Sequence, residues 1–169
     1  MSGGENQQIG QTARSRPDVQ IREAAISDFP ILYEFQLDPV ANEIAALHPR
    51  TAEEFWAHRT AGMTDPDVIA RTILADGKIA GSIAVFKTEG LFCVGYWIGT
   101  HFWGQGIATR ALALLLEQVT HRPLYAHVAV QNIASLRVLQ KCGFIEIARA
   151  QSPATERWQA CEEIEMRLE

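Results

Sequence analysis

The fold is decided by residues 95–116, which read GYWIGTHFWGQGIATRALALLL. The first four residues are apolar or β-prone and predict the end of a strand, and Gly99, Gly104 and Gly106 predict a turn. From Ile107 onward the residues are strong helix formers, with no acidic side chain in the first turn. Free backbone N–H groups and a partial positive charge make a helix N-terminus a site for anions. We therefore expect this turn to bind a phosphate or a pyrophosphate.

Two common phosphate loops can be tested by their spacing. Residues 99–104 have the Gly-x-x-x-x-Gly frame of a nucleotide P-loop, but Gln105 and Gly106 follow in place of Lys and Ser or Thr. Residues 104–109 begin like a dinucleotide-binding fingerprint, but Thr109 replaces the third glycine and no acidic residue lies about 20 residues further on. Neither loop fits this sequence well.

A second motif, NIASLRVLQKCGF, occupies residues 132–144. Asn132 is a favourable N-cap, and apolar residues recur at helical spacing after it. Gly143 suits the left-handed position that follows a helix, and Phe144 can pack back on the helix. Taken alone, this motif predicts a capped amphipathic helix.

Together the two motifs resemble the GNAT acetyltransferases. Gly106-Ile107-Ala108 is similar to the Gly-x-Gly/Ala segment of the family's motif A, within the form Trp-Gly-x-Gly-x-Ala-Thr of the ribosomal-protein N-terminal acetyltransferase branch. The same branch has a motif B of the form Asn-x-x-Ser-x-x-x-Leu-x-x-x-Gly-Phe. All its marked positions are matched, by Asn132, Ser135, Leu139, Gly143 and Phe144. The resemblance is clear over residues 93–148.

The resemblance implies that acetyl-CoA is the co-substrate and identifies residues that would bind it. The pyrophosphate would lie against the backbone of Gly104, Gln105, Gly106, Ile107, Ala108 and Thr109. The strand edge at Tyr96, Trp97 and Ile98 would pair with the pantetheine amides as an added strand does. Asn132 would contact the pantetheine or phosphate arm, although a role as N-cap alone explains an asparagine there equally well.

The catalytic groups are less well defined. By resemblance, Ser135 would donate a proton to the departing thiolate; the alternative is a serine that satisfies local backbone. Many relatives have a glutamate as general base where this chain has Cys93, and a strand cysteine is a poor base. We prefer His127, because an ordinary imidazole titrates near neutrality. A packed or solvent-facing role for His127, a base function for His101 and an ordered water stay open. The spacing of Cys, His and Asp suits no metal site.

Composition bounds the function. The chain has 169 residues, 47% hydrophobic and 21% charged, and a net charge of −5, which disfavours nucleic-acid or anionic-membrane binding. Its three cysteines are widely spaced, and it has neither a signal peptide nor an apolar run long enough to cross a bilayer. We expect a flexible tail over residues 1–18 and one cytoplasmic domain over 19–169. Homodimerisation is left open.

The order of elements indicates a mixed α/β fold. Expected strands cover 19–22, 68–74, 78–87, 91–98, 124–130, 144–150 and 162–168. Expected helices begin near Ser27, Thr51, Ile107 and Asn132, and Pro39 should interrupt the first of them. The GNAT resemblance implies a mostly antiparallel sheet, flanked by helices, in which the strands before the two motifs splay apart.

The predicted function is transfer of an acetyl group from acetyl-CoA to a primary amine by direct attack in a ternary complex. The acceptor would be a protein N-terminus or a small-molecule amine, bound by residues 27–64 and 145–162. The substitution at Cys93 leaves one alternative, a non-catalytic acyl-CoA sensor or interaction module.

Overall fold

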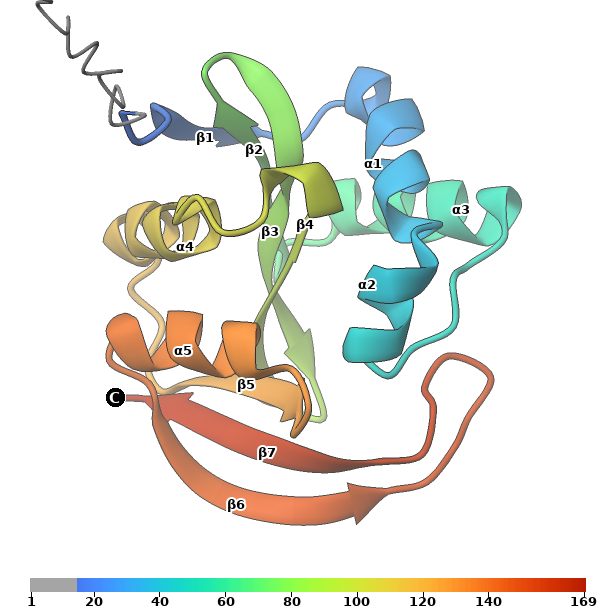
Figure 1. Cartoon of the computed structure of the whole chain (residues 1–169), viewed down its shortest axis with the longest axis vertical. Coiled ribbons are helices and arrows are strands. Elements are labelled where there is room, and N and C mark those ends of the chain that lie inside the picture. Colours follow the sequence, from blue (N-terminus) through green and yellow to red (C-terminus); the bar gives the residue numbers. More distant parts are fainter. Residues whose placement is uncertain (1–14) are drawn as a thin grey trace, which may run out of the picture.

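The computed structural model describes residues 15–169, and its centre is a seven-stranded sheet in the order β1-β2-β3-β4-β5-β7-β6 (Figure 1). The strands are β1 (Val19–Glu23), β2 (Ile69–Ala75), β3 (Lys78–Thr88), β4 (Leu91–Ile98), β5 (Leu124–Ala129), β6 (Ile145–Ser152) and β7 (Cys161–Leu168). The α-helices are α1 (Phe29–Gln36), α2 (Pro39–Ile44), α3 (Ala52–Thr64), α4 (Ile107–Gln118) and α5 (Ile133–Lys141). Two 3-10 turns, η1 (Ile26–Asp28) and η2 (Thr100–Phe102), precede α1 and the glycine turn.

The sheet is antiparallel except between β4 and β5, which run parallel. Within the described residues, the register joins β4 to β5 at one pair, Cys93 and Tyr125. Beyond that pair the two strands separate toward Ile98 and Ala129. This confirms the predicted mixed α/β sheet with its splayed strand pair.

Helices cover both faces of the sheet. Figure 1 shows α4 and α5 on one side, with α1, α2 and α3 on the other. The larger core packs α4 on the sheet through side chains such as Leu112 and Leu115, which are fully buried. The other face holds an aromatic cluster of Phe29, Phe55 and Trp56. A hydrophobic cluster therefore packs on each face of the sheet, and the gap between β4 and β5 lies between these two packed layers.

Short-range signals in the sequence give the expected local structures. The hairpin residues Asp76 and Gly77 have φ angles of 48° and 76°, as a two-residue type I′ turn requires. At the start of α3, Glu54 N donates to Thr51 Oγ1 (3.3 Å) and Thr51 N donates to Glu54 Oε2 (2.8 Å). This reciprocal capping box confirms the predicted helix start.

The prediction that Pro39 interrupts the first helix misses a further helix. Pro39 is the first residue of α2, and Asp38 is its N-cap, accepting from Val40 N (2.9 Å) and Ala41 N (3.2 Å). Proline fits the first helical position because its missing N–H would have no partner there. The Asp-Pro pair therefore marks a new helix, and three α-helices separate β1 from β2.

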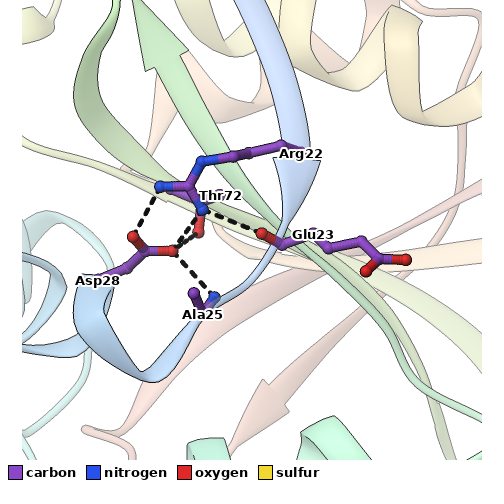
Figure 2. A network of polar contacts seen from close by, with 5 residues as sticks. All are labelled: Arg22, Glu23, Ala25, Asp28 and Thr72. Atoms are coloured by element: carbon purple, nitrogen blue, oxygen red, sulfur yellow. Dashed lines mark hydrogen bonds and ion pairs between the residues drawn. The ribbon is translucent and has the colours of Figure 1, made fainter.

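A buried carboxylate ties η1 to the first two strands (Figure 2). Asp28, which is 2% exposed, accepts two bonds of 2.7 Å from the guanidinium of Arg22 and one of 2.7 Å from Thr72 Oγ1. Ala25 N also donates to Asp28 at 3.0 Å. These donors, led by Arg22, lower the pKa of Asp28 to about 2.

The expected tail, residues 1–18, lies mostly outside the described residues. Its last residue, Asp18, is fixed to the β2–β3 hairpin, because Asp18 N donates to Asp76 Oδ1 and Asp76 N to Asp18 O, both at 2.9 Å. In the part of the chain that the structure describes, no helix is both long and apolar enough to cross a membrane.

Candidate active site

The glycine turn leaves the start of α4 open. Gly104 and Gly106 have φ angles of 72° and 77°, and a side chain built on either would meet nothing within 4 Å. Gly106 is the N-cap of α4, so no side chain caps this helix, and Ile107 at its first position is buried. The N–H groups of the first turn, including those of Ala108 and Thr109, thus remain available to a ligand.

The turn is held in shape by side chains from within it. Trp103 Nε1 donates to Ile98 O at 2.9 Å, and Gln105 Nε2 donates to His101 O at 3.2 Å. The His101 ring packs against Phe35, with centroids 5.4 Å apart. His101 is therefore part of the aromatic packing around the turn.

The N-terminus of α5 is capped, in contrast to that of α4. Asn132 Oδ1 accepts from Ser135 N at 3.1 Å, which confirms the predicted N-cap. Gly143 follows the helix with a φ of 92°, and Phe144 is buried behind it, as expected. The cap uses one lone pair of the Asn132 amide oxygen, and within the described residues its amide nitrogen makes no hydrogen bond and can donate to a ligand.

Tyr96 and Ser135 form a contact that sequence reasoning missed. The Tyr96 hydroxyl lies 2.8 Å from Ser135 Oγ and also donates to Ser135 O at 3.2 Å. Burial is the main cause that raises the pKa of Tyr96 to about 12. Tyr96 therefore keeps its proton at neutral pH, and its side chain links the splayed edge of β4 to motif B.

The strand before the glycine turn carries Cys93 and Trp97. Cys93 is 2% exposed, and burial, with a smaller effect from Glu165, raises the pKa of its thiol. A thiol that stays neutral accepts protons poorly, so Cys93 does not replace the glutamate of the family. Trp97 Nε1 donates to Phe35 O at 2.9 Å, which anchors β4 to α1.

His127 lies just beyond the last β4–β5 pair and faces a cavity of about 220 Å³. Its Nδ1 is 3.7 Å from Glu163 Oε2, and the same carboxylate oxygen accepts from Ser152 Oγ at 3.1 Å. Ala129, Trp158 and Cys161 also line this cavity. It combines an imidazole, a carboxylate and an aromatic surface, which suit an amine.

Glu163 and Ser152 were not predicted as site residues. They come from β7 and β6, and the antiparallel register places Glu165 opposite His127 and Glu163 two pairs further on, opposite Ala129. The only sequence signal is the alternation of Cys161, Glu163 and Glu165 on one face of the last strand. Within residues 15–169, no three His, Cys, Asp or Glu side chains gather closely enough to hold a metal ion.

Comparison with solved structures supports the same fold. Spermidine N-acetyltransferase from Vibrio cholerae, in complex with CoA and spermine, is similar with a TM-score of 0.76 and 14% identity over 89% of this chain and 94% of that one. RimJ from Mycobacterium smegmatis, in complex with CoA-disulfide, has a TM-score of 0.70 and 20% identity over 89% and 81% of the two chains. RimL, a ribosomal L7/L12 alpha-N-protein acetyltransferase in complex with coenzyme A, has a TM-score of 0.70 and 18% identity over 89% and 94%.

Sequence comparison identifies the family. No curated protein sequence matched the chain. A family model described as an acetyltransferase (GNAT) domain matches residues 18–145, which include both motifs and end at the first residue of β6, so that β7 lies outside the match. This match spans well over half of the 169 residues, and the sheet with its splayed strands agrees with it. The chain belongs to the GNAT acetyltransferase family.

Proposed function

We propose that the protein transfers an acetyl group from acetyl-CoA to the primary amine of a peptide N-terminus or a small molecule. The observation that carries the proposal is the uncapped N-terminus of α4, which follows β4 through the glycine turn, together with the side of β4 that faces β5 and has no paired residue beyond Cys93. A pyrophosphate binds to the free N–H groups of such a helix N-terminus, and a pantetheine chain pairs with such an unpaired strand edge. Acetyl-CoA, which contains both groups, is the acyl donor.

The residues of the glycine turn hold the donor. The backbone of Gly104 and Gly106 leaves open space in front of the first turn of α4, and the N–H groups from Gln105 to Thr109 bind the pyrophosphate. The edge of Tyr96, Trp97 and Ile98 pairs with the pantetheine amides. The amide nitrogen of Asn132 contacts the same arm from the start of α5.

Two pairs of side chains transfer protons in the proposed reaction, His127 with Glu163 and Ser135 with Tyr96. The donor supplies an activated thioester, which the amine attacks directly, with no acyl-enzyme. His127 takes a proton from the acceptor ammonium through Nε2, because Nδ1 faces Glu163 at 3.7 Å. As the carbon–sulfur bond of the thioester breaks, the attacking nitrogen gives its second proton to Ser135 Oγ. Ser135 Oγ, 2.8 Å from the Tyr96 hydroxyl, passes its own proton to the departing sulfur, so the serine ends neutral. Holding both reactants in one cleft supplies much of the rate.

The acceptor binds on the face opposite α4 and α5. The cavity of His127 is lined by Ala45 from the end of α2 and by residues 152–161, all within the segments expected to bind the acceptor. Among similar proteins, one was crystallised with spermine and another is a ribosomal-protein N-acetyltransferase. Both are amine acetyltransferases, which supports an amine acceptor here.

We further infer one catalytic domain over residues 19–169 that works in the cytoplasm. The cysteines Cys93, Cys142 and Cys161 are all free, as in a reducing compartment. The net charge of −5 disfavours nucleic acid and anionic membranes as partners.

The function is tested by incubating the protein with acetyl-CoA and a panel of peptides and amines while following free coenzyme A and the acetylated product by mass spectrometry. The expected result is release of coenzyme A that depends on the amine and matches the product formed. Tight binding of acetyl-CoA with no amine-dependent release would instead favour a non-catalytic acyl-CoA sensor, the alternative that the neutral Cys93 thiol raises.

A further inference from the structure

Three arginines from separate segments gather beside the proposed acceptor cleft. Arg50 precedes α3, Arg59 lies within α3, and Arg157 lies in the loop between β6 and β7. That loop is fixed to the α2–α3 connection, because His48 N donates to Arg157 O and Gln159 N to Ala46 O, both at 2.8 Å. Arg50 and Arg157 thereby line one cavity of about 210 Å³.

The guanidinium groups of these three arginines use few of their N–H donors in hydrogen bonds within the described residues. Arg59 donates to Ser82 Oγ at 2.8 Å and lies 5.1 Å from the centre of the Phe55 ring. Arg157 donates to the carbonyl of His48, and the Arg50 side chain makes no hydrogen bond within residues 15–169. Each guanidinium carries five N–H donors, so most stay free for a ligand.

No carboxylate neutralises the arginines at short range. Among the described residues, none of the three has an Asp or Glu oxygen within 4.0 Å. Glu54 and Glu156 line the same cavity, but neither lies within 4.0 Å of the three guanidiniums, and Glu54 is engaged with Thr51 in the capping box of α3. Partly buried charges without a partner are costly, which makes this cluster a strong place for an anion.

The electrostatics of the cluster agree with an excess of positive charge. Burial, followed by the charge of Arg50, lowers the pKa of both Arg59 and Arg157 to about 10. Loss of solvent and then the charges of the three arginines lower the pKa of His58 to about 4. His58 is therefore neutral at pH 7, and because the three arginine charges also act on it, an anion bound among them should raise its pKa.

The position of the cluster relates it to the acceptor. Ser82, the partner of Arg59, stands opposite Trp97 in the β3–β4 register, on the segment of β4 assigned above to the pantetheine. Arg157 is next to Trp158, which lines the cavity of His127. We propose that Arg50, Arg59 and Arg157 bind a carboxylate or phosphate carried by the acceptor amine. This inference rests on the proposed acetyl transfer and specifies the acceptor class.

The first test compares acceptors that differ only in charge. Glycyl-glutamate amide is paired with glycyl-glutamine amide, and O-phosphoethanolamine with ethanolamine, which distinguishes a carboxylate from a phosphate. In the wild type, kcat/KM should be at least about tenfold higher for an anionic member than for its neutral partner. Arg50→Gln should remove most of this ratio. Arg71→Gln is the control and should leave the ratio unchanged, because Arg71 lies on β2 outside the acceptor segments and donates to Gln118 Oε1 at the end of α4.

A stability measurement separates ligand binding from a structural role. Because Arg50 makes no side-chain hydrogen bond within the described residues and is close to like charges, Arg50→Gln should leave the thermal midpoint unchanged or raise it. A clear fall in the midpoint would show that Arg50 supports the fold and would overturn its assignment to an anion.

A third measurement is independent of catalysis. NMR titration of the His58 imidazole should show that inorganic phosphate raises its pKa in the wild type but not in Arg50→Gln/Arg157→Gln, relative to chloride at equal ionic strength. Absence of this shift, or equal kcat/KM within both acceptor pairs, would overturn the anion site while acetyl transfer stands. A phosphate-dependent shift without acetylation of any amine would preserve the anion site and reject the proposed function.

Discussion

At the scale of single residues, Gly106 has the conformation on which the proposed binding of the donor depends. Its φ of 77° lies in the left-handed region, where a residue with a branched Cβ is strained, and open space surrounds the position of its missing side chain. That space lies in front of the free N–H groups of α4. Glycine here therefore serves both the turn and the approach of a ligand.

Gly106→Val should weaken coenzyme A binding by at least about tenfold, because it strains the turn and fills the space before the helix. Isothermal titration calorimetry measures the effect. Gly77→Val is a matched control, since Gly77 has a φ of 76° and equally open surroundings but lies in the β2–β3 hairpin. Equal affinity for coenzyme A in the two variants would refute the assignment of Gly106.

His127 is the second residue with a testable role. His127→Gln keeps the shape of the cavity but cannot take up a proton, so kcat should fall by about 100-fold or more while acetyl-CoA affinity stays unchanged. Steady-state kinetics with an amine that the protein acetylates measure kcat, and calorimetry measures the affinity for acetyl-CoA. Turnover within twofold of wild type would remove the base assignment and favour an ordered water.

At the scale of elements, most of the fold could be predicted because its signals are local. Periodicity located the seven strands to within two residues at each end, and the hairpin residues Asp76-Gly77 gave one turn correctly. The helix α2 was missed because Pro39 was interpreted as a break, although Asp38 before it is a good N-cap.

The candidate site residues also divide into those with a local signal in the sequence and those brought together only by the fold. Asn132 and Gly106 could be found because a cap or a turn depends on neighbours in sequence. Glu163 meets His127, and Arg157 approaches Arg50, only through strand register and loop docking over long separations. No local pattern encodes such contacts, and the Tyr96–Ser135 pair was missed for the same reason.

Asp28 joins η1 to β1 and β2, so its contribution belongs to the scale of elements (Figure 2). Its pKa is about 2 in the folded state against an ordinary 3.8, so its ionised form stabilises the fold at and above pH 4. The shift corresponds to roughly 2 kcal/mol, which is lost as the pH falls through 2.

Asp28→Asn should therefore lower the free energy of unfolding by about 2 to 3 kcal/mol at pH 7, as measured by urea denaturation. The difference between variant and wild type should shrink as the pH falls from 4 to 2, because Asp28 becomes protonated there. A difference that does not change with pH would show that the Arg22–Asp28 pair does not contribute in this way.

At the scale of the whole molecule, the splay between β4 and β5 connects the two functional faces. In the proposed function, the donor approaches along the edge of β4 beside α4 and α5, whereas the cavities of His127 and of Arg50 and Arg157 lie among segments from the other side. The sheet parts beyond Cys93 and Tyr125, so an acyl group can reach an amine across it. Family membership is consistent with this arrangement.

The central claim is that the start of α4 binds the pyrophosphate of coenzyme A, and calorimetric titration with coenzyme A and with pantetheine tests it most directly. Both ligands carry the arm that pairs with β4, but only coenzyme A carries the pyrophosphate and its nucleotide. We predict one-to-one binding of coenzyme A and at least about 100-fold weaker binding of pantetheine. No uptake of coenzyme A by the folded protein, or equal affinity for the two ligands, would contradict the account.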